Sequence, residues 1–255
     1  QPLALVMTTS GNIVLNCFGD MTATGTFFAS GGTLPYTFPL VSNTTGGTPA
    51  APGFNSQVFF GAGAGTIVYS VTDAKGCTAN NTIVITQPAL LTPGSIGANQ
   101  VVCNGSNPAT LTELTAPTGG PAAYVYQWQY SNNAGGPFIN IAGANASTYT
   151  PPANATATLY YQRMVTSGTC LPVYSNVVEI LVNPRPLGIL TGGETICPGA
   201  TSMLKVNLPI GTGPFELDIE NYPGLTVTGY VSDADIPVSP AVTTTYKLLR
   251  IRDAN

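Results

Sequence analysis

The clearest strand pattern in the chain is Gly65-Thr-Ile-Val-Tyr-Ser-Val-Thr-Asp-Ala-Lys-Gly-Cys77, followed by Thr82-Ile-Val-Ile-Thr86. Apolar residues alternate with polar ones through most of its first part, a period of two that is typical of a half-buried β-strand. Asp-Ala-Lys-Gly is a turn signal, and the returning part is rich in β-branched residues. The stretch therefore predicts an antiparallel hairpin that carries Cys77 in its turn.

The composition extends this interpretation to all 255 residues. Hydrophobic residues make up 44% of the chain, enough for several small cores, whereas charged residues make up only 7%, against a usual value of about 25%. Twenty-nine glycines and 22 prolines, without a Gly-X-Y period, supply turns. We therefore expect an all-β chain with uncharged polar faces.

The phrase Cys-x-Gly divides the chain into units, because it recurs at Cys17, Cys103 and Cys197. We predict three tandem immunoglobulin-like β-sandwich domains in an extended array, the third incomplete. Their predicted bounds are residues 1–88, 89–184 and 185–255, the last unit being C-terminally truncated. The joints at Gln87-Pro88 and Asn183-Pro-Arg-Pro186 carry proline, which stiffens linkers, so neighbouring domains should keep a preferred orientation.

The cysteines are expected to form disulfides within domains, Cys17 with Cys77 and Cys103 with Cys170, each stapling one pole of its sandwich. The absence of histidine and of any CxxC spacing argues against a zinc site. Cys197 should find its partner just past Asn255, since the final residues overlay the segment that leads to Cys77. The pattern favours an oxidising, extracellular compartment and a fragment cut from a longer array.

Catalysis is not expected, and neither is a cofactor. A chain without histidine cannot build a Ser-His-Asp or Cys-His arrangement. Glu216, Asp218 and Glu220 alternate along one predicted strand, which indicates a solvated edge, with calcium binding as the alternative. Asp233 and Asp235 are weak candidates for a calcium site, since calcium is bound by several carboxylate and carbonyl oxygens. Aspartates in turns, such as Asp73, are expected to accept hydrogen bonds from nearby backbone N–H groups.

One aromatic cluster stands out, because Tyr124, Tyr126, Trp128 and Tyr130 share one face of a predicted strand. Trp128 resembles the core tryptophan of immunoglobulin-like sandwiches. The alternative is a ligand contact at Trp128, Tyr124 and Tyr126, where aromatic rings would stack on a sugar. The core position is the favoured interpretation.

Charge limits the partners further. Seven Lys and Arg residues and a net charge of −4 supply no basic stripe for nucleic acid. No apolar run reaches the roughly 18 residues that a membrane span needs. We therefore predict neither nucleic-acid binding nor a membrane span in this segment.

The first unit resembles the SprB repeat of Bacteroidota surface proteins. The residues that carry the resemblance are Cys17-Phe-Gly19, Ser30-Gly-Gly-Thr33, Pro35-Tyr-Thr37, Gly65 to Cys77, and Thr82-Ile-Val-Ile-Thr-Gln-Pro88. The other two units are similar to the immunoglobulin-like or PKD-like modules that accompany it, through Tyr126-Gln-Trp128, Ser175-Asn-Val-Val178, Thr195-Ile-Cys197 and Thr244-Thr-Tyr246.

The resemblance implies an extracellular, surface-anchored array that serves adhesion or gliding motility and leaves the cell by type IX secretion. We therefore expect a non-catalytic structural segment of a large repetitive adhesin or surface filament. Its expected partners are neighbouring repeats, the type IX secretion machinery during export, and a surface polysaccharide or other cell-surface ligand. Two alternatives stay open: a subunit of a self-assembling extracellular fibre, and a glycan-binding module of a secreted enzyme.

Overall fold

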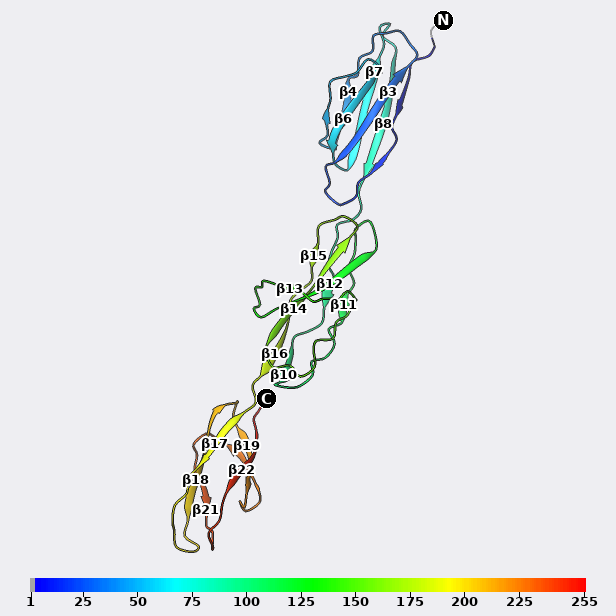
Figure 1. Cartoon of the computed structure of the whole chain (residues 1–255). Helices are drawn as coiled ribbons and strands as arrows, with labels where there is room; N and C mark the ends of the chain where they lie inside the picture. Colours follow the sequence, from blue (N-terminus) through cyan, green and yellow to red (C-terminus); the bar gives the residue numbers. More distant parts are fainter. Residues whose placement is uncertain (1–2) are drawn as a thin grey trace.

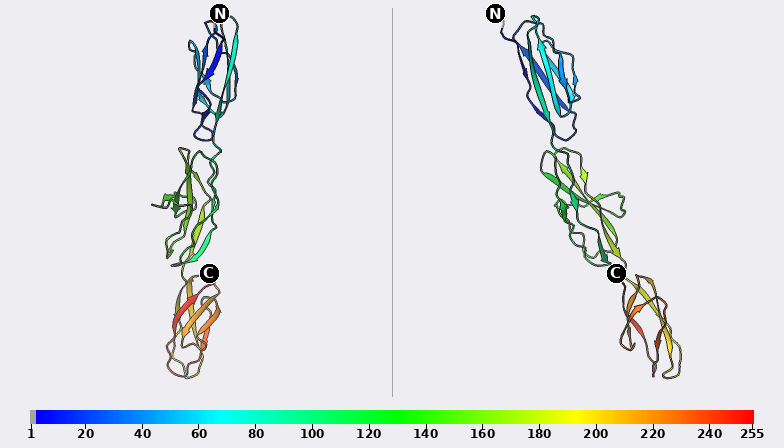
Figure 2. Two further views of the ribbon diagram at one scale, coloured as in Figure 1. Left: turned by 90° about the vertical axis from the view of Figure 1, so that its right-hand side faces the viewer. Right: turned by 180° about the vertical axis from the view of Figure 1, so that it is seen from behind.

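The computed structural model describes residues 3–255 and shows three β-sandwich domains arranged end to end (Figure 1). The arrangement is equally extended from the two further directions of Figure 2. Each domain has its own buried hydrophobic cluster, formed by residues between Met7 and Ile85, between Ile96 and Ile180, and between Leu204 and Val238. The predicted all-β array of three sandwiches is confirmed.

The first domain consists of two four-stranded sheets, in the orders β1-β3-β6-β5 and β2-β8-β7-β4. Its strands are β1 (Val6–Thr9), β2 (Ile13–Val14), β3 (Ala23–Ser30), β4 (Leu40–Asn43), β5 (Thr48–Pro49), β6 (Ser56–Ala62), β7 (Gly65–Thr72) and β8 (Thr78–Thr86).

The predicted hairpin is confirmed, because β7 and β8 pair antiparallel from Gly65↔Ile85 to Thr72↔Thr78. The alternation works as expected: Ile67, Tyr69 and Val71 are buried in the core. Outside the named strands, Thr37 forms a single antiparallel bridge with Thr72.

The second domain has a large sheet in the order β10-β16-β14-β12-β13, with β15 attached to β14, and a small sheet of β9 and β11. Its strands are β9 (Ser95–Ile96), β10 (Gln100–Cys103), β11 (Glu113–Thr115), β12 (Tyr124–Ser131), β13 (Ile139–Asn140), β14 (Leu159–Ser167), β15 (Val173–Tyr174) and β16 (Val178–Asn183). β12 and β14 pair along eight residues each, which makes them the centre of this domain.

The third domain packs two three-stranded sheets, β17-β18-β21 and β20-β19-β22. Its strands are β17 (Leu187–Thr191), β18 (Ser202–Ile210), β19 (Phe215–Glu220), β20 (Thr226–Tyr230), β21 (Ile236–Val238) and β22 (Lys247–Arg252). β22 leads back toward the second domain, so that the C-terminal residue lies at the joint between the second and third domains (Figures 1 and 2).

Candidate functional site

The Cys-x-Gly phrase is the same turn in all three domains. The carbonyl oxygen of Cys17, Cys103 or Cys197 accepts a hydrogen bond from the N–H three residues later, at 3.3, 2.9 and 3.0 Å. The glycine of each phrase has a φ of 80°, 83° or 78° in the same order. A positive φ at the third position defines a type II turn and explains why glycine stands there.

A second recurrent turn lies at the opposite pole of each domain, and in the first domain it is organised by Asp73. One carboxylate oxygen of Asp73 accepts the Thr33 N–H, and the other accepts the N–H groups of Lys75 and Cys77, all at 2.9 Å. The hydrogen bond from Thr33, together with those from Cys77 and Lys75, lowers the pKa of Asp73 despite its burial. The expected backbone role of this aspartate is confirmed.

These two kinds of turn meet at the first joint, where Cys17 forms a disulfide with Cys170. The bridge joins the lower pole of the first domain to the upper pole of the second, with the two Cα atoms 5.5 Å apart. The predicted pairings within domains, Cys17 with Cys77 and Cys103 with Cys170, are wrong. Cys77, Cys103 and Cys197 are exposed free thiols in the described part of the chain.

The reason for the error is the parallel pairing of β2 with β8, in the register Ile13↔Ile85 and Val14↔Thr86. This pairing places Cys17 beside the end of β8, whereas Cys77 stands just before its start. A strand of this length spans about 30 Å, far more than the Cα separation of at most about 7 Å that a disulfide allows. The second domain repeats the arrangement, with Cys103 opposite Asn183 at the end of β16.

The first joint is also held by polar contacts. The side-chain oxygen of Gln87, in the linker, accepts the Gly19 N–H at 2.7 Å, and the sulfur of Cys170 lies 3.7 Å from the carbonyl oxygen of Asn16. A crevice of about 270 Å³ borders the bridge and is lined by residues of both domains, including Phe18 and Leu171. Both the linker and the disulfide therefore tie the Cys17 turn to the second domain.

The second joint repeats these contacts without a bond between sulfurs. The Arg185 guanidinium, in the linker, donates to the carbonyl oxygen of Asn104 at 3.1 Å. The sulfur of Cys103 lies 3.8 Å from the carbonyl oxygen of Asn255. The segment after β22 thus lies against Cys103 at the second joint, as the segment after β14 lies against Cys17 at the first joint.

The aromatic residues proposed as ligand contacts serve the second domain's interior. Trp128 is fully buried and donates its indole N–H to the carbonyl oxygen of Ala146 at 2.9 Å, so it offers no ring face to a sugar. The Tyr124 hydroxyl donates to Gly119. The Tyr126 ring packs on the guanidinium of Arg163, 4.6 Å from its centroid. These contacts assign the cluster a packing role.

Sequence reasoning missed the most unusual residue of this core, the fully buried Arg163. Its guanidinium donates to the Glu113 carboxylate and to the Ser147 carbonyl oxygen, both at 2.8 Å, and to the Pro93 carbonyl oxygen at 3.3 Å. A signal existed in the sequence, since Arg163 shares the parity of the buried Tyr161 and Val165 along β14. Burial raises the pKa of Tyr161 to about 12.

The acidic residues of the third domain are engaged with other side chains. Glu216, Asp218 and Glu220 face Arg252, Arg250 and Lys247 across β19 and β22, at distances between 2.6 and 3.8 Å. Asp233 accepts the side-chain amide of Asn207, and Asp235 pairs with Lys205 at 3.3 Å. Within residues 3–255, no three His, Cys, Asp or Glu side chains gather as metal ligands would.

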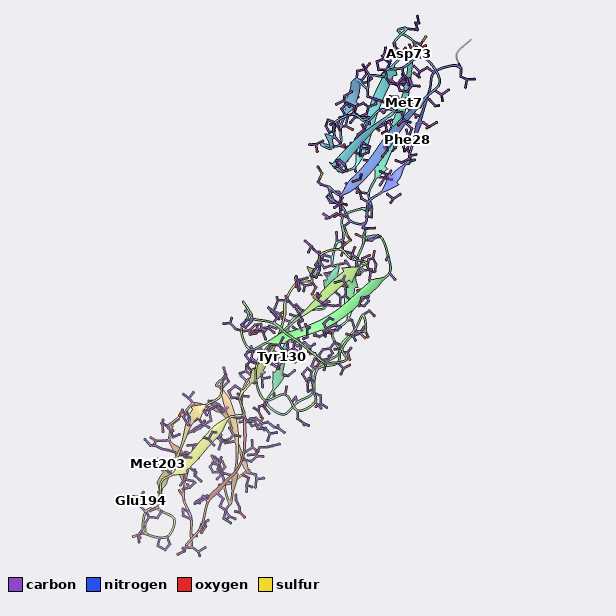
Figure 3. All side chains as sticks on the ribbon, turned by 45° about the horizontal axis from the view of Figure 1, so that its top comes forward. Met7, Phe28, Asp73, Tyr130, Glu194 and Met203 are labelled. Carbon is purple, nitrogen blue, oxygen red and sulfur yellow. A yellow bond between two sulfur atoms is a disulfide. The ribbon has the colours of Figure 1, made fainter. Side chains whose placement is uncertain are left out.

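A cavity of about 840 Å³ lies in the third domain and is lined by Ile196, Pro198 and the segment 240–248. Figure 3 shows Glu194, another of its lining residues, toward the outer end of the third domain, while Asp73 lies near the outer end of the first. Residues 3–255 include no helix with the length and apolar character that a membrane crossing demands.

The architecture defines the class of protein: a tandem array of immunoglobulin-like β-sandwiches. A family model described as "Domain of unknown function (DUF8696)" matches residues 92–184. No curated protein matches the chain in sequence.

Three of the solved structures that the chain resembles are multi-domain fragments. A three-immunoglobulin fragment of titin, in an E-to-A mutated variant, is 11% identical over 86% of this chain and 80% of its own, with a TM-score of 0.46. Extracellular cadherin domains 3–6 of protocadherin gamma B2 are 11% identical over 98% and 71%, with a TM-score of 0.41. The two immunoglobulin domains of DIP-gamma are 12% identical over 69% and 97%, with a TM-score of 0.40.

Proposed function

We propose that this chain is a non-catalytic structural segment of a large extracellular adhesin or surface filament, in which it holds neighbouring domains in line under tension. The observation that carries the proposal is the disulfide between Cys17 and Cys170, because it joins two folded domains rather than two strands of one. The extended arrangement supports it too (Figure 1). An oxidising, extracytoplasmic location follows from the need to keep such a bond.

The bridge provides a covalent route past most of two domains. Tension that enters near the N-terminus reaches Cys17 and crosses directly to Cys170. Residues 18–169, which include β3 to β8 and β9 to β14, lie outside this covalent route while the bond lasts. The linker contact from Gln87 to Gly19 fixes the same joint without carrying the main force.

Residual dipolar couplings test the rigidity of the joint. We expect one alignment tensor to describe the first and second domains of the oxidised wild type, and two different tensors to be needed for Cys17→Ser. The matched control is Cys77→Ser, which removes an exposed free thiol and should leave the single tensor unchanged. Independent tensors for the oxidised wild type would contradict a rigid, bridged joint.

The finer assignment is to the gliding-motility adhesins of Bacteroidota that type IX secretion exports. It rests on the likeness of the segments from Gly65 to Cys77 and from Thr82 to Pro88 to the SprB repeat. An antibody raised against the first domain tests it on intact cells of the source strain. We expect surface labelling that disappears when type IX secretion is disabled, and labelling that persists there would overturn this assignment.

A ligand on the cell surface remains part of the proposal, but the buried Trp128 removes the ring face on which a glycan-binding module would depend. A glycan array on the whole chain tests the remaining alternative. Tyr126→Phe is the variant to use at that position, because it keeps the ring that packs on Arg163. Binding that persists in this variant and in every other aromatic variant of the cluster would place any ligand outside it.

A second candidate function, a subunit of a self-assembling fibre, is favoured by the edge position of β22. In the described chain β22 pairs with β19 alone, whereas β7 and β14 are each covered on both sides, by β4 and β8 and by β12 and β16. A strand from another copy would add there, although the charges of Lys247, Arg250 and Arg252 oppose such pairing. Sedimentation velocity over rising concentration separates the two: growing oligomers indicate a fibre, and one monomeric species indicates a stalk.

A further inference from the structure

We propose that two copies of this chain join end to end through a disulfide between Cys197 of one copy and Cys77 of the next. The new joint has the construction of the bridged joint within the chain, with Cys197 in the place of Cys17 and Cys77 in the place of Cys170. The inference goes beyond the proposed function, because it assigns the array a covalent partner, a second copy, whatever ligand the array binds.

The two cysteines lie at opposite ends of the extended molecule, and both are exposed free thiols in the described chain. The Cys77 N–H donates to the Asp73 carboxylate, and Figure 3 shows Asp73 near the outer end of the first domain. Cys197 follows Glu194 closely in the sequence, and Figure 3 shows Glu194 toward the outer end of the third domain. A bond between these two cysteines therefore joins copies head to tail.

The first support is that the upper end of the first domain copies the upper end of the second, the surface that receives Cys17. In both domains a pair of glycines turns the chain against the segment that enters the domain. The Gly32 N–H donates to the carbonyl oxygen of Leu3 at 2.7 Å. At the same place in the second domain, the Gly120 N–H donates to that of Ala89 at 2.9 Å.

The glycine before each of these makes the same contacts in the two domains. The Tyr36 hydroxyl donates to the carbonyl oxygen of Gly31. In the second domain the Tyr124 hydroxyl donates to that of Gly119 at 3.0 Å. A side chain on either glycine would clash with a carbonyl oxygen of the entering segment, so the two loops lie equally close to it.

The turn that carries the cysteine is also built in the same way. The Asp73 carboxylate and the Ser167 hydroxyl each accept a backbone N–H from the chain just after these glycines, at 2.9 and 3.0 Å. A cysteine closes each turn, because the Cys77 N–H donates to the Asp73 carboxylate at 2.9 Å. The Cys170 N–H donates to the Ser167 carbonyl oxygen at 3.2 Å. Cys77 is therefore presented at the upper end of the first domain as Cys170 is at that of the second.

The apolar surface beside the bridge is repeated as well. On the side of the second domain, residues 89–91 and Gly120 line the crevice at the first joint. The hydrogen bonds of Gly32 and Gly120 place residues 3–5 at the same position on the first domain. Leu3 is 82% exposed there, so this surface is open to a second copy.

The second support is the turn of Cys197, which repeats that of Cys17. Both are type II turns, closed by a hydrogen bond to the cysteine carbonyl oxygen. A side chain added at Gly19 or at Gly199 would meet no atom within 4 Å. The outer face of each turn is therefore open, as a contact with the upper end of another domain requires.

The turn of Cys103 differs in this respect. The space beside Gly105 is filled by the guanidinium of Arg185, and the Cys103 sulfur lies against the carbonyl oxygen of Asn255. Cys103 is thus covered from two sides at the second joint. Cys197 is the remaining free thiol of a Cys-x-Gly turn, and its turn has the open face of the turn of Cys17.

The lower end of the third domain also supplies an apolar surface for residues 3–5 of the next copy. Pro198 stands where Phe18, which lines the crevice at the first joint, stands in the turn of Cys17. The Gly199 N–H donates to the carbonyl oxygen of Pro240 at 3.0 Å, and this contact holds the loop of Val242 close by. Val242 is 76% exposed. Because the two ends are different surfaces, the contact is heterologous and its repetition gives an open filament.

The bond forms by thiol–disulfide exchange with a small oxidised disulfide such as glutathione disulfide. The thiolate of Cys197 attacks this oxidant, forms a mixed disulfide and releases one glutathione thiol. The thiolate of Cys77 in a second copy then attacks the Cys197 sulfur and releases the other. Two protein thiols lose two hydrogen atoms in total, and one molecule of oxidant becomes two thiols.

The test uses the whole chain with Cys103→Ser as a common background. One variant adds Cys77→Ser and keeps the lower thiol, and the other adds Cys197→Ser and keeps the upper thiol. Each is oxidised in a glutathione redox buffer, alone and in an equimolar mixture, and analysed by gel electrophoresis without reduction and by peptide mapping. We expect a dimer in the mixture, linked through Cys77 and Cys197, and only monomer in each variant alone. The Cys17–Cys170 peptide is the internal control for folding and oxidation.

Dilution provides a second measurement, because the joint between copies needs two chains to meet whereas the first joint does not. Tenfold dilution of the mixture should slow dimer formation by more than about tenfold and leave the yield of the Cys17–Cys170 link unchanged. The background chain with both end thiols should give a ladder of oligomers that a thiol reductant returns to monomer. Dimers of either variant alone in the yield of the mixture, or no dimer in the mixture beside an intact Cys17–Cys170 bridge, would overturn the inference.

Discussion

At the scale of single residues, the turn that Asp73 organises connects sequence to stability in the first domain. Three backbone N–H groups converge on its carboxylate, and they lower its pKa. Because this pKa is depressed, the ionised carboxylate stabilises the folded domain at pH values above about 3.9, the pKa of aspartate in an unfolded chain. That contribution is lost as the pH falls through the lower folded value.

We therefore expect Asp73→Asn to destabilise the first domain at pH 7 and to flatten the pH dependence of its stability below about pH 4. Methyl NMR signals of the buried Ile83 and Ile85, followed in urea at several pH values, report on this domain alone. The control is Asp235→Asn, at a half-exposed residue of the third domain, which should change neither quantity. An unchanged pH profile in Asp73→Asn would contradict the role of the carboxylate.

The buried Arg163 supports a second residue-scale prediction. Removing the carboxylate in Glu113→Ala leaves a fully buried guanidinium without its countercharge, and loss of one partner of a buried pair costs about 3 kcal/mol or more. Trp128 is the only tryptophan in the chain, so its fluorescence during urea unfolding measures the second domain. Glu179→Ala, which removes only a partner of the Tyr160 hydroxyl, is the control and should cost less than about 1 kcal/mol. Equal losses in both variants would refute the assignment.

At the scale of elements, β19 and β22 are joined both by buried apolar side chains and by ion pairs at the surface. Two substitutions measure how much each kind of contact stabilises the third domain. Leu217 is fully buried, and Leu217→Ala is expected to destabilise the third domain by about 2–5 kcal/mol. Arg250 pairs with Asp218 at 2.6 Å but is 46% exposed, so Arg250→Ala should cost less than about 1 kcal/mol. Urea titration of the Ile219 amide signal measures both. A larger loss in Arg250→Ala than in Leu217→Ala would mean that the charge ladder, not the core, holds these strands.

The strands also show which parts of the fold could be predicted from the sequence. The alternation of apolar and polar residues predicted the β7–β8 hairpin and the inward face of β12, because successive side chains of a strand point to opposite faces of the sheet. The parallel addition of β2 to β8 was not predictable, since two residues of pairing, Ile13 and Val14, leave no periodic signal. That small element decides which pole Cys17 occupies, and so it decided the disulfide pairing.

At the scale of the whole molecule, repetition carried the prediction of three sandwiches in a row, which the fold confirms (Figure 1). The same repetition led to a wrong disulfide prediction. Cys17 and Cys77 lie in one unit, whereas the observed bond joins Cys17 to a cysteine of the next unit. Only the three-dimensional order of the poles shows that the end of one domain and the start of the next are neighbours.

Single-molecule pulling between the two ends of the chain measures whether the Cys17–Cys170 bridge carries tension past two domains. The bridge encloses a sequence separation of 153 residues, which would extend to about 500 Å if released. We predict that the oxidised chain, and Cys77→Ser as its control, never gain this length, and that a thiol reductant releases it. Full extension of the first and second domains in the oxidised chain would show that the bridge does not carry the tension.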